Sequence, residues 1–321
     1  MQASAIAHPN VALIKYWGKR DTEQNLPATG SLSLTLAGLA TRTRVSFDPA
    51  LRADTVSVNG AEDAKAAVGV ARCLDRLRAI AGSRDFARVD SENDFPTGAG
   101  LASSASGYAA LVTAAAAALN IAGHDAERAN IARQGSGSAP RSLYDGIVLL
   151  ENTDDGIACR SVSAPAAWPL SVLVAVTSRA PKSVGSTEGM ERSRLTSPCY
   201  PGWLETHPAD LQAALESVAC RDFEALAKVS EHSCLKMHAL AMSAQPALVY
   251  WNAATMAAMQ VVRDLRAAGT PVFFTIDAGP QLKAVCLPEA APVIKAALSE
   301  CPGVLELVEC SLGEGAHVSE P

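Results

Sequence analysis

Residues 91–120 read SENDFPTGAGLASSASGYAALVTAAAAALN, in which a glycine- and serine-rich loop runs directly into an alanine-rich helix. The start of a helix presents free backbone N–H groups and partial positive charge, and glycines let a ligand approach the backbone closely. Gly98, Gly100, Ser103 and Ser104 are therefore candidates for holding a phosphate. A tight turn that packs a helix closely would have the same composition, so the loop alone leaves both interpretations open. It lacks the Gly-Lys-Ser/Thr ending of the Walker loop, and Ser103 stands where the dinucleotide fingerprint needs its third glycine, so we reject both assignments.

Composition places this loop in a folded chain of 321 residues, with 49% hydrophobic and 19% charged residues. The formal charge of −6 comes without a basic stripe, so we expect no nucleic-acid partner. The longest apolar stretch, residues 108–119, is well short of the roughly 20 residues that span a bilayer, so we expect no membrane partner. The first residues lack the basic and apolar segments of a secretion signal, and the eight cysteines include no C-x-x-C pair. We expect a cytoplasmic protein with reduced thiols.

Hydrophobic periodicity predicts a mixture of strands and helices. An alternation of apolar and polar residues over 31–58 predicts an antiparallel sheet, and a three-and-four spacing over 62–81 predicts a helix that ends at Gly82. The strands GIVLLE (146–151) and SVLVAV (171–176) are expected to complete the first half of the chain. Helices are then expected at 208–218, 221–243, 246–267 and 290–299, with strands at 271–277, 281–287 and 304–310. We predict an α+β fold with an N-terminal domain at 1–180 and a C-terminal domain at 181–321.

The segment ALIKYWGKRD (12–21) places Lys15, Lys19 and Arg20 around Tyr16 and Trp17. Ammonium groups bind phosphate oxygens as point charges, so this pattern could hold a polyanion. A solvated basic edge with the aromatic rings in the core is the alternative, and the segment taken alone favours it.

The segment GSGSAPRSLYDG (135–146) places Ser136, Ser138 and Arg141 within six positions. Two hydroxyl groups and a guanidinium suit a phosphate and a carboxylate, although a capping loop with a surface arginine would look the same. Asp277 ends the apolar run VFFTID (272–277) and by itself could be only a turn residue.

Five segments taken together resemble the mevalonate diphosphate decarboxylases, a family of the GHMP kinase-like superfamily. They are AHPNVALIKYWGKRD (7–21), ENDFPTGAGLASSASG (92–107), ARQGSGSAPRSLY (132–144), GSTEGMERSRLTSP (185–198) and FFTIDAGP (273–280). The resemblance implies a two-domain α+β GHMP kinase-like fold with the active-site cleft between the domains. It also implies ATP and Mg²⁺ as cofactors, mevalonate 5-diphosphate as substrate and a homodimer.

The same resemblance implies roles for individual residues. Those implied to hold the ATP phosphates are Asn93, Gly98, Gly100, Ser103 and Ser104. Those implied to hold the substrate's diphosphate and carboxylate are Tyr16, Lys19, Ser136, Ser138 and Arg141, with Asn10 orienting Arg141. Lys15 and Ser186 are implied to lie near the transferred phosphoryl group, with Asp277 as the catalytic aspartate. The metal ligands are not indicated.

The reaction implied is phosphorylation of the substrate's 3-hydroxyl by ATP, followed by loss of phosphate and carbon dioxide to give isopentenyl diphosphate. A phosphomevalonate decarboxylase, a mevalonate 3-kinase and a catalytically silent binding protein on the same scaffold are the alternatives. Two positions depart from the family pattern, Pro140 where a cysteine is usual and Asp145 where a glycine is usual. Pro140 removes a backbone donor, and Asp145 is expected to add negative charge near a site meant for anions.

Overall fold

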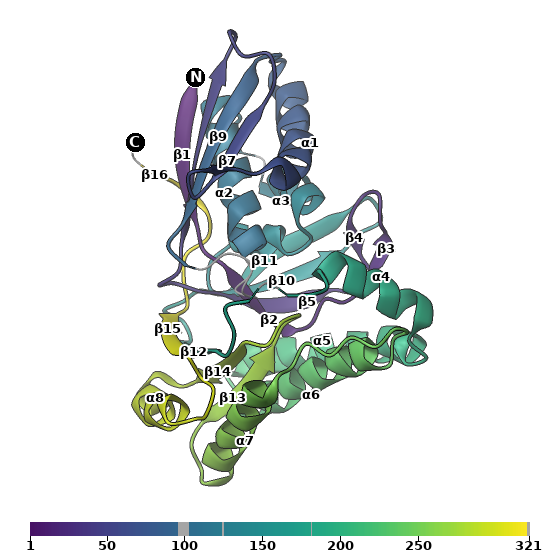
Figure 1. The fold of residues 1–321 in the computed structure, drawn as a ribbon, viewed down its shortest axis with the longest axis vertical. Helices are drawn as coiled ribbons and strands as arrows, with labels where there is room; N and C mark the ends of the chain where they lie inside the picture. The colour runs from purple at the N-terminus through teal and green to yellow at the C-terminus, as the bar shows by residue number, and fades with distance from the viewer. Residues whose placement is uncertain (96–102, 124, 181, 320–321) are drawn as a thin grey trace.

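The computed structural model describes residues 1–95, 103–123, 125–180 and 182–319, whose strands form three larger sheets and one two-stranded ribbon (Figure 1). The six-stranded sheet has the order β16 (His317–Ser319), β1 (Gln2–Ala7), β6 (Thr41–Asp48), β9 (Phe86–Asn93), β7 (Thr55–Val58) and β8 (Ala61–Glu62). The central four-stranded sheet has the order β11 (Ile157–Ser163), β10 (Ile147–Asn152), β5 (Ser31–Thr35) and β2 (Asn10–Ile14). The third has the order β13 (Val272–Ile276), β14 (Leu282–Cys286), β12 (Ser171–Val176) and β15 (Glu306–Ser311), and the ribbon pairs β3 (Lys19–Asp21) with β4 (Leu26–Pro27).

The alanine-rich helix α2 (Ser103–Ala118) is buried almost all round and packs on β1 and β6. Its small side chains let the surrounding elements approach closely, which a helix of larger residues would prevent. The neighbours on its other sides are α1 (Ala64–Ala81), α3 (Asp125–Gly135) and the 3₁₀ helix η1 (Ala139–Leu143). The Asp63 side chain accepts from the Ala66 N–H at the start of α1, and Gly82 ends that helix with a φ of 66°.

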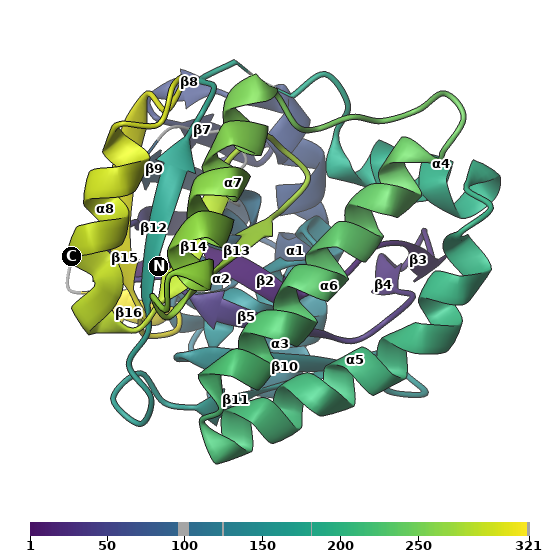
Figure 2. The same ribbon diagram turned by 90° about the horizontal axis from the view of Figure 1, so that it is seen from below.

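Figure 2 shows the remaining helices from below. They are α4 (Ser186–Thr196), α5 (Tyr200–Cys220), α6 (Phe223–Met242), α7 (Ala253–Ala267), η2 (Pro288–Ala290) and α8 (Ala291–Ser299). Helix α5 packs on α6 and on the central sheet, α6 and α7 pack on β13, and α8 packs on β12 and β15. One buried cluster joins Leu13 and Leu32 of the central sheet to Leu226 of α6 and Phe273 of β13, so the two halves of the chain share a core. No helix among the described residues is long and apolar enough to cross a bilayer.

The expected single antiparallel sheet over residues 31–58 is wrong. Strand β5 is buried on both faces in the central sheet, whereas β6 alternates buried and exposed residues in the six-stranded sheet, and β7 pairs with β9 in parallel. Strand β12, which was expected to complete the first half of the chain, lies between β14 and β15 in the third sheet. The period of two identifies a strand, but it carries no information about which strand is its neighbour.

Two helices also differ from their predicted bounds. Helix α5 begins at Tyr200 and continues through Pro208, because buried Trp203 and His207 hold the turns before the proline against the core. Helix α7 begins at 253, where the Asn252 and Thr255 side chains form a reciprocal capping box.

The last strand returns to the N-terminal half and is tied to the segment that carries Arg141. The Gly315 N–H donates to Asp145 Oδ1 at 2.6 Å, and the Ala316 N–H donates to the Ser142 carbonyl at 3.0 Å. Asp145 therefore anchors the returning chain and does not line the large cavity described below. Pro140 lies in the first turn of η1, where a missing backbone N–H costs little.

We expect Asp145→Ala to lower the free energy of unfolding by about 1 kcal/mol, because it removes a charge-assisted hydrogen bond to a backbone N–H. Asp145→Asn keeps an acceptor oxygen and serves as the matched control. The midpoint of thermal unfolding compares the two variants. An alanine variant as stable as the asparagine variant would contradict this anchoring role.

Candidate active site

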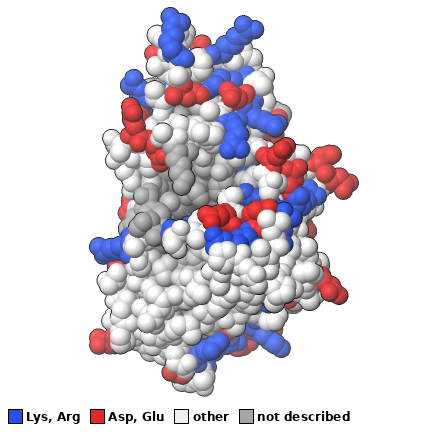
Figure 3. Space-filling model, turned by 45° about the vertical axis from the view of Figure 1, so that its right-hand side comes forward, with Lys and Arg blue, Asp and Glu red and all other residues white. Residues whose placement is uncertain are grey.

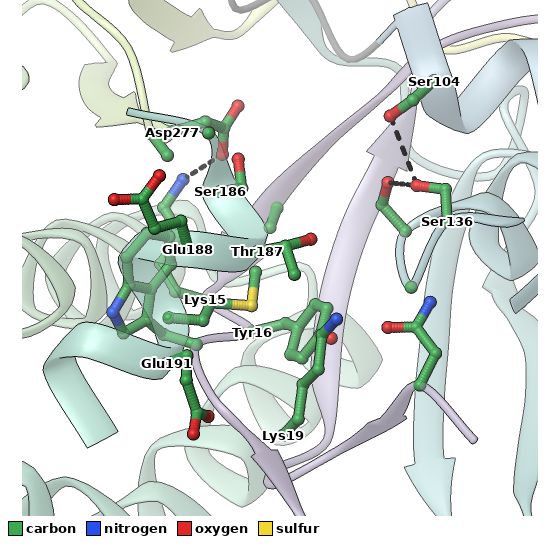
Figure 4. Close-up of a pocket in the computed structure, with 18 of the residues that line it drawn as sticks. Lys15, Tyr16, Lys19, Ser104, Ser136, Ser186, Thr187, Glu188, Glu191 and Asp277 are labelled. Carbon is green, nitrogen blue, oxygen red and sulfur yellow. Dashed lines mark hydrogen bonds and ion pairs between the residues drawn. The ribbon is translucent and has the colours of Figure 1, made fainter. Parts of the chain in front are cut away.

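A cavity of about 1040 Å³ lies where the two halves of the chain meet, and residues from both halves line it. The predicted site residues that line it are Asn10, Lys15, Tyr16, Lys19, Ser104, Ser136, Ser138, Arg141, Ser186 and Asp277. Figure 4 shows Ser104 and Ser136 on one side of this cavity and Lys15, Ser186 and Asp277 on the other. The predicted residues Gly98 and Gly100 lie outside the described residues.

Asp277 is held between two lysines. Lys15 Nζ lies 2.7 Å from Asp277 Oδ1, and Lys283 Nζ lies 3.1 Å from Oδ2. Both lysines are fully buried, whereas 27% of the Asp277 side chain remains accessible. Burial alone would raise the pKa of Asp277, but Lys15 and Lys283 outweigh it and hold the pKa well below its usual range. The carboxylate therefore stays ionised and is a poor proton acceptor.

The backbone around this ion pair is fixed by contacts between distant segments. The Lys15 N–H donates to Ser233 Oγ of α6 at 3.0 Å, and His207 of α5 contacts the Lys15 carbonyl through Nε2 at 3.1 Å. Thr275 of β13 donates its hydroxyl to the Ala12 carbonyl of β2 at 3.2 Å. Lys15 and Asp277 follow these two strands directly, so the strand contact sets the geometry of the pair.

Lys182 is a third lysine near Asp277, on the side of α4. Its Nζ donates to Ser186 Oγ at 2.9 Å and lies 3.4 Å from the Ala278 carbonyl. Burial lowers the pKa of Lys182, and nearby Asp277 partly opposes this effect. Neither Lys182 nor Lys283 was predicted from the sequence. Lys283 stands in the otherwise apolar strand β14, and a charged residue in such a strand was the signal that could have identified it.

On the opposite side, the hydroxyl groups of three serines form a chain. Ser104 Oγ lies 3.3 Å from Ser136 Oγ, which lies 3.1 Å from Ser138 Oγ. Asn10 Nδ2 donates to the Ser138 carbonyl at 3.0 Å and to Ser142 Oγ at 2.8 Å, and so holds the η1 segment from both ends. This contact places Asn10 on the backbone around Arg141 rather than on the guanidinium itself.

Arg141 and Tyr16 each have a buried polar atom without a hydrogen-bond partner among the described residues. Arg141 is buried and donates from Nη1 to Ser31 Oγ at 2.7 Å, but its Nε has no partner. The buried Tyr16 hydroxyl also lacks a partner among the described residues, and burial raises the pKa of Tyr16. A Cβ at Gly137 would lie 2.7 Å from this hydroxyl, so a larger residue there would displace the Tyr16 ring. Buried polar atoms are normally paired, so these atoms indicate a place for a polar ligand.

Lys19 lines the cavity from strand β3, where it is half-buried. Partial burial lowers the pKa of Lys19, and Glu191 of α4 opposes that shift. Arg192 also lines the cavity, as does its ion-pair partner Glu188 at 2.6 Å. Cationic side chains outnumber anionic ones among the described residues of this cavity, although the chain as a whole has a formal charge of −6.

A second cavity of about 470 Å³ shares Ser104 with the first. The predicted residues Asn93 and Ser103 line it, together with apolar side chains that include Val56, Val70 and Leu111. Asn93 accepts from the Thr41 hydroxyl at 2.6 Å, which fixes its side chain in the lining of this cavity. Apolar walls beside a few polar groups suit a flat heterocycle.

No group of three or more His, Cys, Asp or Glu side chains able to hold a metal is found among the described residues. On the face drawn in Figure 3, basic and acidic side chains are interspersed over the upper part and the middle of the molecule. All eight cysteines are free thiols.

The chain matches known proteins over both of its halves. Residues 7–163 match the diphosphomevalonate decarboxylase-like N-terminal domain, and residues 172–304 match the mevalonate 5-diphosphate decarboxylase C-terminal domain. The human diphosphomevalonate decarboxylase is 37% identical over 84% of this chain and 73% of its own length. The Aspergillus fumigatus enzyme of the same name is 37% identical over 87% of this chain and 75% of its own.

Solved structures agree with these sequence matches. The mevalonate diphosphate decarboxylase of Staphylococcus aureus has a TM-score of 0.93 at 34% identity, covering 99% of this chain and 98% of that one. A structure described as MDDEF in complex with MVAPP, AMPPCP and magnesium has a TM-score of 0.92 at 36% identity, covering 100% of this chain and 99% of that one. The resemblance seen in the sequence and the α+β GHMP kinase-like fold are thus confirmed, and the chain belongs to the diphosphomevalonate decarboxylase family.

Proposed function

We propose that this chain converts mevalonate 5-diphosphate and ATP to isopentenyl diphosphate, ADP, phosphate and carbon dioxide in the mevalonate pathway. The observation that carries this proposal is the ionised Asp277 between Lys15 and Lys283, at the edge of a cavity rich in cations and hydroxyl groups. A member of this family with these groups has the chemistry to bind two phosphorylated substrates and to stabilise a phosphoryl group in transfer.

The nucleotide is proposed to occupy both cavities. Ser103 and Ser104, at the start of α2, would face the ATP phosphates together with the positive end of that helix. The apolar part of the second cavity would then accept the base, with Tyr108 and Leu111 in its walls. In the similar structure with AMPPCP, an ATP analogue is bound together with MVAPP.

ATP with Mg²⁺ supplies the phosphoryl group, and the metal neutralises part of the phosphate charge. The described residues fit a metal of this kind. Mg²⁺ keeps several waters and binds phosphate oxygens, so it needs few protein ligands. The hydroxyl groups of Ser104 and Ser136 lie where phosphates and their water shell would be received.

The substrate's diphosphate and carboxylate are proposed to lie against the η1 side. Tyr16, Lys19, Ser136 and Ser138 would donate to the diphosphate, which gives the unpaired Tyr16 hydroxyl a partner. Arg141 would orient the carboxylate through its unpaired Nε, while Ser31 holds the other end of the guanidinium. Asn10 would keep the η1 backbone in place.

In the first step, the substrate's 3-hydroxyl attacks the terminal phosphoryl group. Asp277 would accept the hydrogen bond of this hydroxyl and hold it in line while the bond between the phosphorus and the ADP oxygen breaks. Because the pKa of Asp277 is low, the proton passes to this carboxylate late, as a loose transition state allows. Lys15, Ser186 and Lys182 would stabilise charge on the transferred group.

In the second step, the tertiary phosphate leaves and positive charge develops at the third carbon. The carboxylate electrons quench this charge as carbon dioxide departs. Arg141 must therefore orient the carboxylate without binding it too tightly, because strong binding of the charged ground state would oppose its conversion to a neutral gas.

We further propose a homodimer in the cytoplasm, with the domain boundary near residue 180. Free thiols at all eight cysteines fit a reducing compartment, and the homodimer is expected from the family resemblance. Strand β12, at 171–176, belongs to the third sheet, so limited proteolysis would distinguish a boundary near residue 180 from one at 164–170, between β11 and β12.

The proposed function predicts equal release of carbon dioxide and ADP with mevalonate 5-diphosphate and Mg-ATP. Mevalonate and its 5-phosphate, tested in parallel, should give neither product at a comparable rate. ADP without carbon dioxide would instead identify a 3-kinase, turnover of the monophosphate would identify a phosphomevalonate decarboxylase, and no release from any of the three would favour a silent binding protein.

We expect Asp277→Asn to lower turnover by at least about a thousandfold while nucleotide binding is kept. The nucleotide contacts lie on the α2 side, whereas the hydroxyl of the second substrate loses its acceptor. Single-turnover rates and equilibrium titration with an ATP analogue measure the two properties separately, at a temperature where circular dichroism shows a folded chain. Turnover near that of the wild type would overturn the role given to Asp277.

A further inference from the structure

Lys283 is a charged residue in a place that apolar residues normally occupy. It lies on β14 between Leu282 and Ala284, pairs with Thr275 and Val174 on the neighbouring strands, and is 1% exposed. Desolvating an ammonium group costs several kcal/mol unless a close partner compensates. A leucine or methionine at this position would avoid that cost, so the fold alone gives no reason for a lysine here.

The contacts of Lys283 point to a task at Asp277. Its Nζ lies 3.1 Å from Asp277 Oδ2, the oxygen that Lys15 does not contact. Unlike Lys15 and Asp277, Lys283 is absent from the described lining of the large cavity, and it contacts the Asp277 carboxylate from the side of the core. Lys15 and Lys283 thus hold the two oxygens of one carboxylate and fix its plane.

We propose that Lys283 is a positioning residue for the reaction proposed above, on which this inference rests. It locks the Asp277 carboxylate from the side of the core and keeps it ionised. It also gives the Lys15–Asp277–Lys283 group a net charge of +1, which favours the anionic phosphoryl group beside it. Lys15 alone would leave that group neutral and Asp277 free to turn about its side-chain bonds.

The pH dependence follows from the titratable groups that face Asp277 among the described residues. These groups are Lys15 after β2, Lys182 before α4, Lys283 on β14, Arg141 in η1, and Cys234 and His238 on α6. Burial and the charge of Lys15 lower the pKa of His238 to about 3, so this ring stays neutral near pH 7. Removing Lys283 raises the pKa of Asp277, and the acid limb of kcat then moves to higher pH.

Replacing Lys283 should affect the stability of the fold differently from the activity. Lys283→Met leaves Asp277 paired with Lys15, so no carboxylate becomes unpaired and one buried ammonium is removed. We therefore expect a midpoint of thermal unfolding equal to or above that of the wild type. A residue that merely supports the fold would give the opposite result.

The test compares Lys283→Met and Lys283→Gln with Lys295→Met, which removes an exposed lysine paired with Glu309. Measured quantities are kcat, KM for both substrates, the kcat–pH profile and the unfolding midpoint. We expect Lys283→Met to lower kcat about ten- to a hundredfold, with each KM changed less than about threefold. Lys283→Gln keeps a donor but not the charge, so it should recover part of kcat while the acid limb stays displaced. Lys295→Met should match the wild type.

These measurements distinguish failure of the proposed function from failure of the role given to Lys283. Wild-type enzyme without decarboxylase activity would refute the proposed function itself. An active wild type with an unchanged kcat and pH profile in Lys283→Met would overturn the role of Lys283 and leave the function standing. A lower unfolding midpoint with an unshifted acid limb would show a structural lysine and would equally overturn the inference.

Discussion

The ion pair between Lys15 and Asp277 is the interaction on which the rest of the site depends. Its two residues are 262 positions apart and follow β2 and β13, strands that a shared core and the hydrogen bond from Thr275 to Ala12 hold together. Because both lysines around Asp277 are buried, the carboxylate cannot be removed without leaving uncompensated charge. The same constraint keeps Asp277 ionised and directs its accessible part toward the cavity, where Ser186 and Lys182 converge.

Charge explains how one cavity can serve two anionic ligands. The chain is acidic overall, yet the described lining of its cavity holds five cationic side chains against three carboxylates. They are Lys15, Lys19, Arg141, Lys182 and Arg192 against Glu188, Glu191 and Asp277. Serine hydroxyl groups and an unpaired tyrosine hydroxyl supply donors that need no counter-charge. Asp277 then acts mainly through orientation, because a carboxylate with so low a pKa has little driving force as a base.

The sequence predicted those parts of the site that are local in the chain. Ser136, Ser138 and Arg141 lie on one short turn, and Lys15, Tyr16 and Lys19 lie on one segment, so their spacing already brought them together. Lys182 and Lys283 were missed because their importance comes from their distance to Asp277 and Ser186, which no spacing reveals. The partners of β5, β6 and β12 were missed for the same reason, since hydrophobic alternation marks a strand but not its neighbour. Asp145 was expected near the anion site, and only the returning C-terminal chain shows its actual partner.

Asp277 is electrostatically coupled to the two lysines that contact it. The most direct test of this coupling is a double-mutant cycle measured by thermal unfolding. The unfolding midpoint would be measured for the wild type, Lys15→Met, Asp277→Asn and the double variant. In the wild-type chain, Lys15→Met leaves the Asp277–Lys283 pair and should change the midpoint little. In the Asp277→Asn chain, two buried lysines lack their carboxylate, so Lys15→Met should raise the midpoint. The same change in both backgrounds would mean that the two side chains are not coupled and would contradict the account.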